Sequence, residues 1–326
     1  MNSFGRIFRI QIFGESHGKT VGVLIDGCPS GIALTEDDFT DDLLRRKAGA
    51  KGTTARIEND KPEIKSGVFN GKTTGSPVLI EFLNENTRSK DYSNLVKHPR
   101  PGHADFTNSV KFNNYNDYRG GGHSSGRITL GLVAAGVVAK KIISQISISA
   151  KITRINGSKN IEHEIEKAVK RNDSVGGIIE CIAENVPAGL GEAFFDSVES
   201  NISRLVFSIP GIKAIEFGAG FKAAEMYGSK FNDVIINEKG KTKTNNSGGI
   251  NGGISNGNSI VFRVAVRPAA SISLPQETFN FESGKIETLQ IKGRHDACIA
   301  LRIPVIVEAV TAIALADFML IRKTQT

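Results

Sequence analysis

Four of the six histidines in this 326-residue chain lie in glycine-flanked segments that also carry Ser, Asp or Arg. These segments are residues 14–18, 102–105, 120–127 and 293–298. Histidine exchanges a proton near neutral pH, and glycine lets the backbone approach a ligand closely. Because the segments are spread from residue 14 to residue 298, a site built from them needs almost the whole chain as its scaffold. We therefore expect one domain, residues 1–326, rather than a row of modules.

The charge of the chain favours a small anionic ligand. A formal charge of +7 and a pI near 9.2 suit either nucleic acid or small polyanions. Aromatic residues make up only 7% of the chain, there is no Trp, and the sequence has no helix-turn-helix, zinc-finger or aromatic RNA-binding motif. We expect a small-molecule polyanion and no nucleic acid as the partner.

Cysteine usage and hydropathy indicate a cytoplasmic protein. Cys28, Cys181 and Cys298 are odd in number and far apart, which suits a reducing compartment. The N-terminus has no basic segment leading into a long apolar run, so no signal peptide is expected. Residues 303–320 are the most apolar stretch, but Glu308 and Asp317 interrupt it, so we predict a buried helix and no membrane span.

Hydrophobic periodicity predicts helices and strands that alternate along the chain. We expect strands over residues 8–12, 21–25, 146–152, 175–186 and 260–266, and helices over residues 35–49, 128–146, 161–169, 196–207 and 304–322. Such mixing indicates an α+β or layered α/β arrangement. Residues 84–127 are irregular, which is usual for a functional segment. Residues 237–258, rich in Gly and Asn, are either disordered or a ligand loop, and composition favours disorder.

Residues 120–127 contain the parts of a phosphate cradle. Three consecutive glycines, two serines, a fourth glycine and Arg127 stand directly before the predicted helix, where backbone amides favour an anion. The segment lacks the Lys-Ser/Thr ending of a P-loop. Arg45, Arg46 and Lys51 end the preceding helix or follow it; alone they would be a solvated helix end, but beside a cradle they become candidate anion clamps.

Two histidines are candidates for proton transfer. His17 follows Ser16 in a tight turn and is a candidate general acid or base, with a purely structural histidine as the alternative. His103 and Asp105 form a His-x-Asp pair, which suits a histidine–carboxylate pair, a metal site or a self-capped turn. No compact set of three or four ligands accompanies them, so we predict no metal.

Taken together, the motifs resemble the signature blocks of the chorismate synthase family. The blocks are Phe-Gly-Glu-Ser-His-Gly at 13–18, Arg-Pro-Gly-His-Ala-Asp at 100–105 with residues 117–127, and Gly-Arg-His-Asp-Ala-Cys at 293–298. The resemblance spans residues 4–320 in colinear order. It implies an α+β fold with a helical layer between β-sheets. It also implies a cytoplasmic homotetramer that converts 5-enolpyruvylshikimate 3-phosphate to chorismate with reduced FMN, and it leaves open whether a separate flavin reductase or NADPH reduces the flavin.

The resemblance assigns roles by motif. His17 matches the acid toward the departing phosphate, His103 the group that protonates reduced flavin, and Asp296 the partner of flavin N5. Ser16 and Ser125 match serines near the reacting groups. Basic residues that match substrate-binding or flavin-binding positions are Arg45, Arg46, Lys51, Arg127 and Arg294. Flavin-contacting stretches correspond to His123, Ser124, Ser125, Pro210, Gly211, Gly252, Arg267, Pro268, Ala269, Ala270 and Ser271.

Several positions depart from the commonest family pattern, and two rival functions stay open. The departures are Lys47, Ala48, His123, Ala269, Ala270 and Ala297. One rival is a basic nucleic-acid-binding protein, whose affinity would fall steeply with salt. The other is a metal-dependent phosphohydrolase using His103, Asp105 and His295, which a chelator would inactivate.

Overall fold

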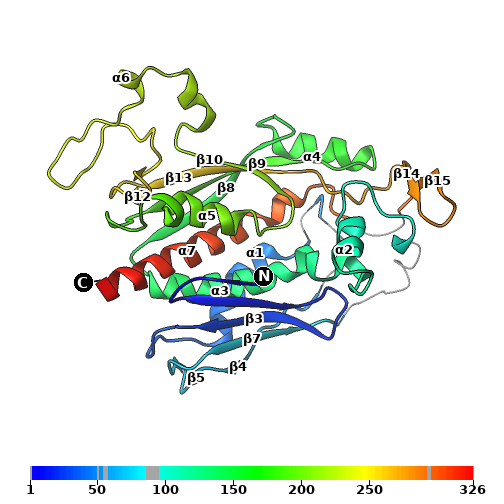
Figure 1. Ribbon diagram of the computed structural model, residues 1–326, viewed down its shortest axis with the longest axis horizontal. Helices are drawn as coiled ribbons and strands as arrows, with labels where there is room; N and C mark the ends of the chain where they lie inside the picture. Colours follow the sequence, from blue (N-terminus) through cyan, green and yellow to red (C-terminus); the bar gives the residue numbers. More distant parts are fainter. Residues whose placement is uncertain (1, 50, 54–57, 86–94, 292–294, 326) are drawn as a thin grey trace.

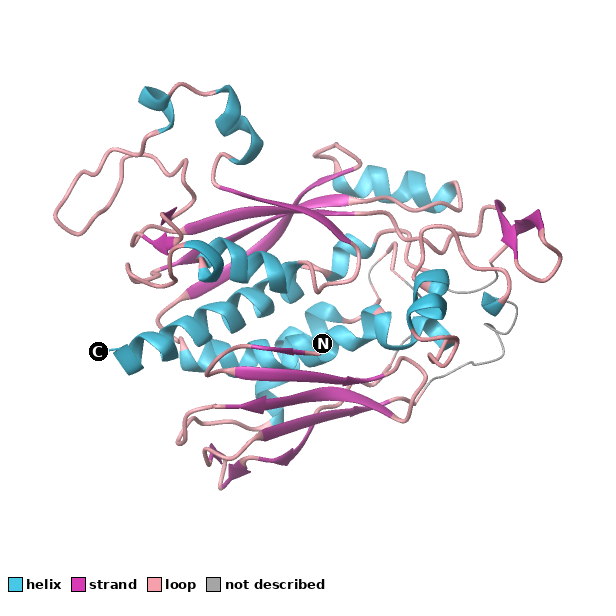
Figure 2. Cartoon of the chain, in the orientation of Figure 1, coloured by secondary structure: helices cyan, strands magenta, loops and turns pink. Residues whose placement is uncertain are grey.

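The chain folds into two antiparallel sheets with a layer of helices between them (Figure 1). The computed structural model describes residues 2–49, 51–53, 58–85, 95–291 and 295–325. Figure 2 shows the two sheets above and below and the helices in the middle. The expected α+β class, with helices between sheets, is confirmed.

The first sheet has the strand order β1-β2-β3-β7-β4. Its strands are β1 (Ser3–Phe4), β2 (Arg9–Gly14), β3 (Thr20–Asp26), β4 (Glu63–Ser66) and β7 (Val78–Leu83). Alternate residues of β3, namely Val21, Val23 and Ile25, are fully buried because successive side chains point to opposite faces of a strand. The strands predicted over residues 8–12 and 21–25 are thereby confirmed, and they hold the connection at residues 15–19 between them.

The second sheet has the strand order β10-β13-β9-β8. Its strands are β8 (Ser147–Ile155), β9 (Gly177–Glu184), β10 (Ile212–Phe217) and β13 (Ile260–Val266). Ile260, Phe262, Val264 and Val266 alternate into the core as predicted. The strands expected over residues 146–152, 175–186 and 260–266 are all confirmed.

The middle layer is built on α3 (Thr129–Ile142) and α7 (Pro304–Gln325), which pack closely against each other. Gly136 allows this close approach, because a Cβ at that position would lie 2.3 Å from the Cβ of Ala309. Helices α1 (Thr40–Arg46) and α5 (Val198–Val206) pack beside them. The helix predicted over residues 35–49 begins as a 3-10 turn, Glu36–Phe39, and its α-helical part ends at Arg46.

By its length and its composition alone, helix α7 could span a membrane, yet most of it is buried between the sheets. Glu308 accepts hydrogen bonds from the Arg45 guanidinium and from the backbone N–H of Ala150. Asp317 accepts from the N–H groups of residues 6–8. Both charged residues that interrupt the apolar run are therefore satisfied inside the protein, as expected of a core helix.

The remaining elements lie around this core. They are β5 (Val68–Phe69), β6 (Lys72–Thr73), α2 (Asp105–Lys111), α4 (Ile161–Lys170), α6 (Gly228–Phe231), β11 (Ile250–Asn251), β12 (Ile254–Ser255), β14 (Gln276–Asn280) and β15 (Lys285–Leu289). Helix α2 falls inside residues 84–127, where we expected only irregular chain. Residues 237–258 contain the β11–β12 hairpin and are held by side-chain bonds of Asn245 and Asn258, which differs from the disorder that composition favours.

Candidate functional site

The described parts of the four glycine- and histidine-containing segments gather at one end of the helical layer, on the right of Figure 1. Two neighbouring cavities open there, of about 310 Å³ and about 680 Å³. Both are lined by His103, Ser124, Ser125, Pro210, Gly211 and Arg267. The first is the more charged and the second has an apolar wall that includes Ile10, Ile12 and Leu132. Volumes of this size suit small-molecule ligands.

The glycine loop at residues 120–122 lies over two of the candidate histidines. Its three glycines have φ values of 59°, 83° and 55°, which glycine adopts without strain. A Cβ on Gly120 would lie 2.8 Å from Cδ2 of His17, and one on Gly121 would lie 3.2 Å from Cε1 of His103. Only glycine therefore lets the loop cover both imidazoles at this distance.

His103 is fixed by a carboxylate. Its Nδ1 lies 2.7 Å from Oδ1 of Asp105. Arg100 donates from Nη2 to the same oxygen and from Nε to Oδ2 of Asp105, at 2.7 Å each. These bonds from Arg100 and His103 outweigh burial and hold the pKa of Asp105 well below its ordinary value. Nδ1 of His103 also lies 3.0 Å from Nη2 of Arg100, but its contact with the carboxylate is the shorter one. Because an ionised carboxylate only accepts, we assign the proton of His103 to Nδ1, which leaves Nε2 as the second nitrogen.

His17 and Ser16 are buried below the loop rather than on the cavity wall. Ser16 is anchored by its N–H, which donates to the carbonyl of Gly122 at 3.1 Å. Gly120, which covers His17, does line the first cavity. His123 is exposed, lines the second cavity and donates from Nδ1 to the Gly14 carbonyl at 2.7 Å. The two segments are thus joined, with His17 one layer behind the cavity surface.

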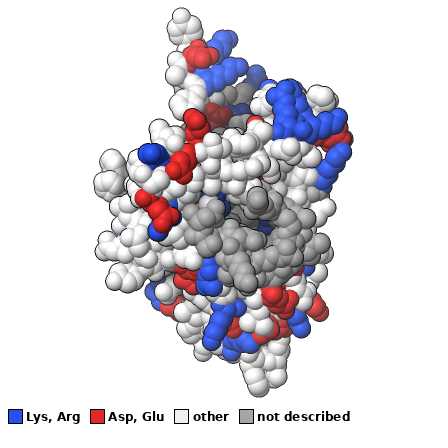
Figure 3. All heavy atoms as spheres, turned by 90° about the vertical axis from the view of Figure 1, so that its right-hand side faces the viewer, with Lys and Arg blue, Asp and Glu red and all other residues white. Residues whose placement is uncertain are grey.

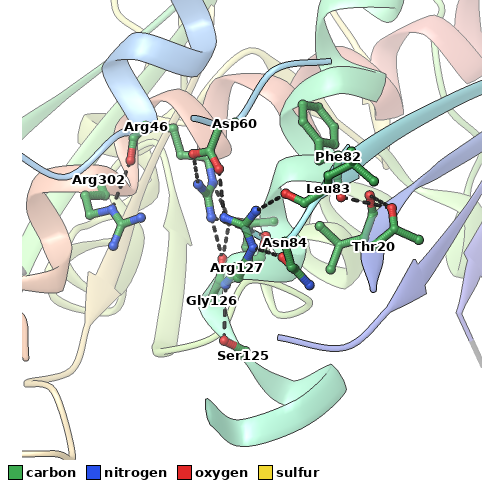
Figure 4. Close-up of polar contacts among 12 residues, drawn as sticks. Thr20, Arg46, Asp60, Phe82, Leu83, Asn84, Ser125, Gly126, Arg127 and Arg302 are labelled. Carbon is green, nitrogen blue, oxygen red and sulfur yellow. Dashed lines mark hydrogen bonds and ion pairs between the residues drawn. The ribbon is translucent and has the colours of Figure 1, made fainter. Parts of the chain in front are cut away.

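Arg46 and Arg127 are brought together, with Asp60 between them (Figure 4). Arg46 comes from the end of α1 and Arg127 from the 3-10 turn Gly126–Ile128 that leads into α3. Both line the first cavity. Burial lowers the pKa of Arg46 to about 9, with further lowering by the nearby Arg302 guanidinium. Two predicted anion clamps therefore meet, and both have a carboxylate neighbour.

The other predicted basic residues lie apart from the cavities. Arg45 points away from Arg46 and binds Glu308 through two bonds of 2.7 Å and 2.6 Å. Lys51 is exposed and pairs with Glu166 of α4 at 2.6 Å. Neither lines either of the two cavities. Arg294 lies outside the described residues.

The predicted flavin-contacting stretches are mostly on the cavity walls. Ala269, Ala270 and Ser271 line the first cavity, and the Ser271 hydroxyl accepts from Nη1 of Arg100 at 3.0 Å. Pro268 is exposed and is not part of either wall. Gly252 lies between β11 and β12, also off both walls.

Asp296 lines the first cavity beside two residues that the motif analysis did not assign. Nη1 of Arg302 lies 3.4 Å from Asp296, and its Nε donates to the Arg46 carbonyl at 2.9 Å. His295 is also on this wall, and its buried Nε2 has no hydrogen-bond partner among the described residues. Burial, and then the Arg100 charge, lower the pKa of His295, so the imidazole is held neutral near pH 7.

Sequence reasoning missed Asp60, Arg100 and Arg302 as site residues. Arg100 could have been recognised from the sequence, because it stands in the same motif as His103 and Asp105. Asp60 could not, since no spacing rule links it to Arg127, its partner 67 positions away.

Neither rival function gains support from the described residues. Within the ranges that the structure covers, no group of three or more His, Cys, Asp or Glu side chains could hold a metal ion. Seen from the end that carries the cavities, the basic and acidic side chains form separate groups rather than one basic stripe (Figure 3).

Comparison with known proteins gives one consistent result. The sequence profile of the chorismate synthase family matches residues 8–320. A chorismate synthase of Chitinophaga pinensis is 60% identical over 324 residues, covering 99% of this chain and 98% of that protein. One of Methanocaldococcus jannaschii is 43% identical over 365 residues, covering 98% and 96%. A crystal structure of a chorismate synthase superposes with a TM-score of 0.76 at 28% identity, covering 98% of this chain and 93% of that one.

Proposed function

This chain belongs to the chorismate synthase family, and from that membership we propose how its two cavities carry out the family's reaction. The chain is a lyase of the shikimate pathway, which eliminates phosphate from 5-enolpyruvylshikimate 3-phosphate in a 1,4-anti sense to give chorismate. The observation that carries the proposal is the meeting of His103, Arg127 and Asp296, from three distant motifs, on the wall of one cavity.

We assign the first cavity to the substrate. The substrate carries one phosphate and two carboxylates, and the cavity wall includes Arg46, Arg127 and Arg267. Charge-assisted hydrogen bonds from guanidinium groups to such anions are strong and directional. Lys51 and Arg45 are directed elsewhere in this structure, so Arg46 and Arg127 are the better supported of the proposed substrate-binding residues.

We assign proton transfer to His103 and His17. Asp105 holds the proton of His103 at Nδ1, so Nε2 is the nitrogen that takes up and delivers a proton. His17 lies under Gly120, where it can act on a leaving group only across the glycine loop. Ser16 and Ser125 stay proposed as hydroxyl partners near the reacting groups, the second of them on both cavity walls.

We propose reduced FMN as the cofactor, bound along the second cavity and the wall that the two cavities share. The residues fit a flat ring with a phosphate, because an apolar wall of Ile10, Ile12 and Leu132 stands beside Arg267. Reduced flavin, when bound, supplies reversible electron donation that no side chain here offers. The protein's own contribution is orientation, anion binding and the proton at His103.

The further assignments rest on family membership. We propose that residues 1–326 form a single domain and that four copies assemble into a cytoplasmic homotetramer. We further propose that NADPH or a separate reductase reduces the flavin. Strongly exposed apolar side chains, such as Phe195, Phe221 and Tyr227, offer surface for contact between copies.

Anaerobic turnover of 5-enolpyruvylshikimate 3-phosphate tests the cofactor and the proton-transfer groups. We expect chorismate only with reduced FMN, no product with oxidised FMN, and no effect of a chelator. His17→Ala and His103→Ala should each lower turnover by about 10²-fold or more, while substrate binding changes less. Full-rate product from flavin-free protein would refute the cofactor assignment, and wild-type turnover in both variants would refute the acid–base assignment.

A further inference from the structure

The Asp60 carboxylate lies between two buried guanidinium groups, as Figure 4 shows. Oδ1 of Asp60 accepts from Nη1 of Arg127 at 2.7 Å, and Oδ2 lies 3.5 Å from Nη1 of Arg46. The side chains of Asp60, Arg127 and Arg46 are 5%, 8% and 2% exposed, and all three residues line the first cavity. One carboxylate thus serves two cations at the place where an anionic ligand is expected.

Other partners also hold both guanidinium groups. Arg46 donates from Nε to the Thr129 hydroxyl at 3.0 Å and from Nη2 to the Gly126 carbonyl at 2.9 Å. Arg127 donates to the Asn84 side chain and, at 3.1 Å, to the Leu83 carbonyl. Asp60 is therefore not needed to place either arginine. Its distinct contribution is a negative charge.

A negative charge is needed because three guanidinium groups, those of Arg46, Arg127 and Arg302, lie close together, and the other acidic residues of this wall are Glu58 and Asp296, the second of which faces Arg302. Arg302 stands beside Arg46 and, together with burial, lowers the pKa of Arg46. Asp60 itself has a φ of 52°, a conformation that non-glycine residues seldom adopt, and this conformation accompanies a side chain directed inward. An uncompensated pair of buried cations would be costly, so the carboxylate stabilises the site before any ligand arrives.

We propose that Asp60 is an internal counterion that holds the place of a substrate anion between Arg46 and Arg127. The inference rests on the proposed role of these two arginines in substrate binding. Asp60 neutralises the pair in the empty enzyme, and an incoming phosphate or carboxylate group competes with it for the same N–H donors. The competition weakens binding of every anion, and it favours ligands with several negative charges because they overcome it best.

Asp60→Asn tests the proposal with almost no change in shape. Asn tolerates a positive φ as well as Asp does, so the backbone is preserved. The variant should bind 5-enolpyruvylshikimate 3-phosphate about tenfold more tightly in isothermal titration, because a repelling charge beside the anion is removed. Inorganic phosphate, used as a second probe, should also bind more tightly. The ligand-free variant should melt at a lower temperature, and saturating substrate should raise its melting temperature by more than it raises that of the wild type.

Two further variants keep the test decisive. Asp60→Gly removes the same charge and suits the positive φ, so it replaces Asp60→Asn if that variant folds poorly. Glu63→Gln removes an exposed carboxylate three residues along the chain, paired with Lys65, and should leave both dissociation constants within about twofold. Unchanged or weaker substrate binding in both Asp60 variants, with only a lower melting temperature, would mean that Asp60 is merely structural and would overturn the proposal.

Arg46→Lys and Arg127→Lys separate this inference from the function on which it rests. If both variants bind substrate like the wild type, the arginines do not bind the anion and the site assignment itself fails. If both weaken binding by about tenfold or more while the Asp60 variants do not tighten it, the site assignment stands and only the counterion role is wrong.

Discussion

Replacing Asp105 by Asn should disable His103 while leaving the shape of the site intact. The Asp105 carboxylate accepts from Arg100 at three positions and from His103 at one. An Asn side chain has one oxygen and one NH₂ group to present to the same four donors. With its oxygen at the Oδ1 position, the NH₂ group faces the Arg100 backbone N–H and Nε–H, which are both donors.

The opposite orientation is more favourable. With the oxygen at the Oδ2 position, both of those Arg100 donors stay satisfied, and the NH₂ group faces Nη2 of Arg100 and Nδ1 of His103. Only one donor then faces another donor, namely the NH₂ group against Nη2 of Arg100, provided that His103 moves its proton from Nδ1 to Nε2. The substitution therefore predicts the wrong tautomer of His103, as well as the loss of the negative charge beside it.

The expected size of both effects follows from this geometry. Turnover should fall by about 10²-fold to 10³-fold, the scale of a misplaced general acid–base group. The Arg100 and Asp105 side chains are 4% and 9% exposed, so breaking their ion pair should cost about 3 kcal/mol, or roughly 4 °C in melting temperature. Asp26→Asn, which removes an exposed carboxylate paired with Arg9, is the control and should change neither quantity appreciably.

The pH dependence gives an independent check. The folded-state pKa of Asp105 is lowered, so its contribution to stability is present above the ordinary carboxyl value of 3.8 and disappears as the pH falls below it. The difference in melting temperature between wild type and Asp105→Asn should be full near pH 7 and should shrink from about pH 5 downward. A folded variant with wild-type turnover under anaerobic conditions with reduced FMN would refute the role given to the Asp105–His103 pair.

Two glycine substitutions test the packing around the site and the core. Gly120→Ala should lower turnover by about tenfold or more, because the new Cβ would lie 2.8 Å from Cδ2 of His17 at a φ of 59°. Gly228→Ala, where a Cβ meets no atom within 4 Å, is its control and should keep wild-type turnover. Gly136→Ala should lower the free energy of unfolding by about 1–3 kcal/mol, measured by denaturant titration, because its Cβ would lie 2.3 Å from that of Ala309. Adding Ala309→Gly should not restore this loss, because the new Cβ would still lie 2.5 Å from the Cα of residue 309, and a double variant as stable as the wild type would contradict this account of the helix contact.

The sequence predicted two kinds of element, strands with one buried face and the helices α3 and α7, which are apolar almost all round. Strands β3 and β13 were predictable because each places every second side chain in the core. The hairpin β14–β15 was not predicted, because it lies outside the main core and most of its residues are exposed or half-buried. Strand β7 was also missed, although Val78, Ile80 and Phe82 alternate into the core as clearly as the residues of β3 do.

Features of the site that depend on neighbouring residues in the sequence were predictable. Features that depend on charged residues far away in the sequence were not. The three positive φ values at residues 120–122 follow from consecutive glycines, and the His103–Asp105 contact follows from a spacing of two residues. Arg45 and Arg46 are neighbours in the sequence, yet one binds Glu308 and the other faces Asp60. Which arginine enters the cavity depends on the helical rotation between them and on partners elsewhere in the chain, and periodicity alone does not reveal those partners.

The charge of the first cavity must be counted after its internal ion pairs are considered. Arg100 is neutralised by Asp105, Arg302 faces Asp296, and Arg46 and Arg127 share Asp60. Across the described ranges, no ion pair joins the other cations of this wall, Arg267 and Lys47, to a carboxylate. Among the cations of this wall, these two therefore contribute most to the attraction of an approaching polyanion, because the fields of the paired cations largely cancel, while the Glu58 carboxylate on the same wall opposes it. In our proposal, the buried arginines would act at the next stage, when the anion has replaced Asp60 and can accept their hydrogen bonds.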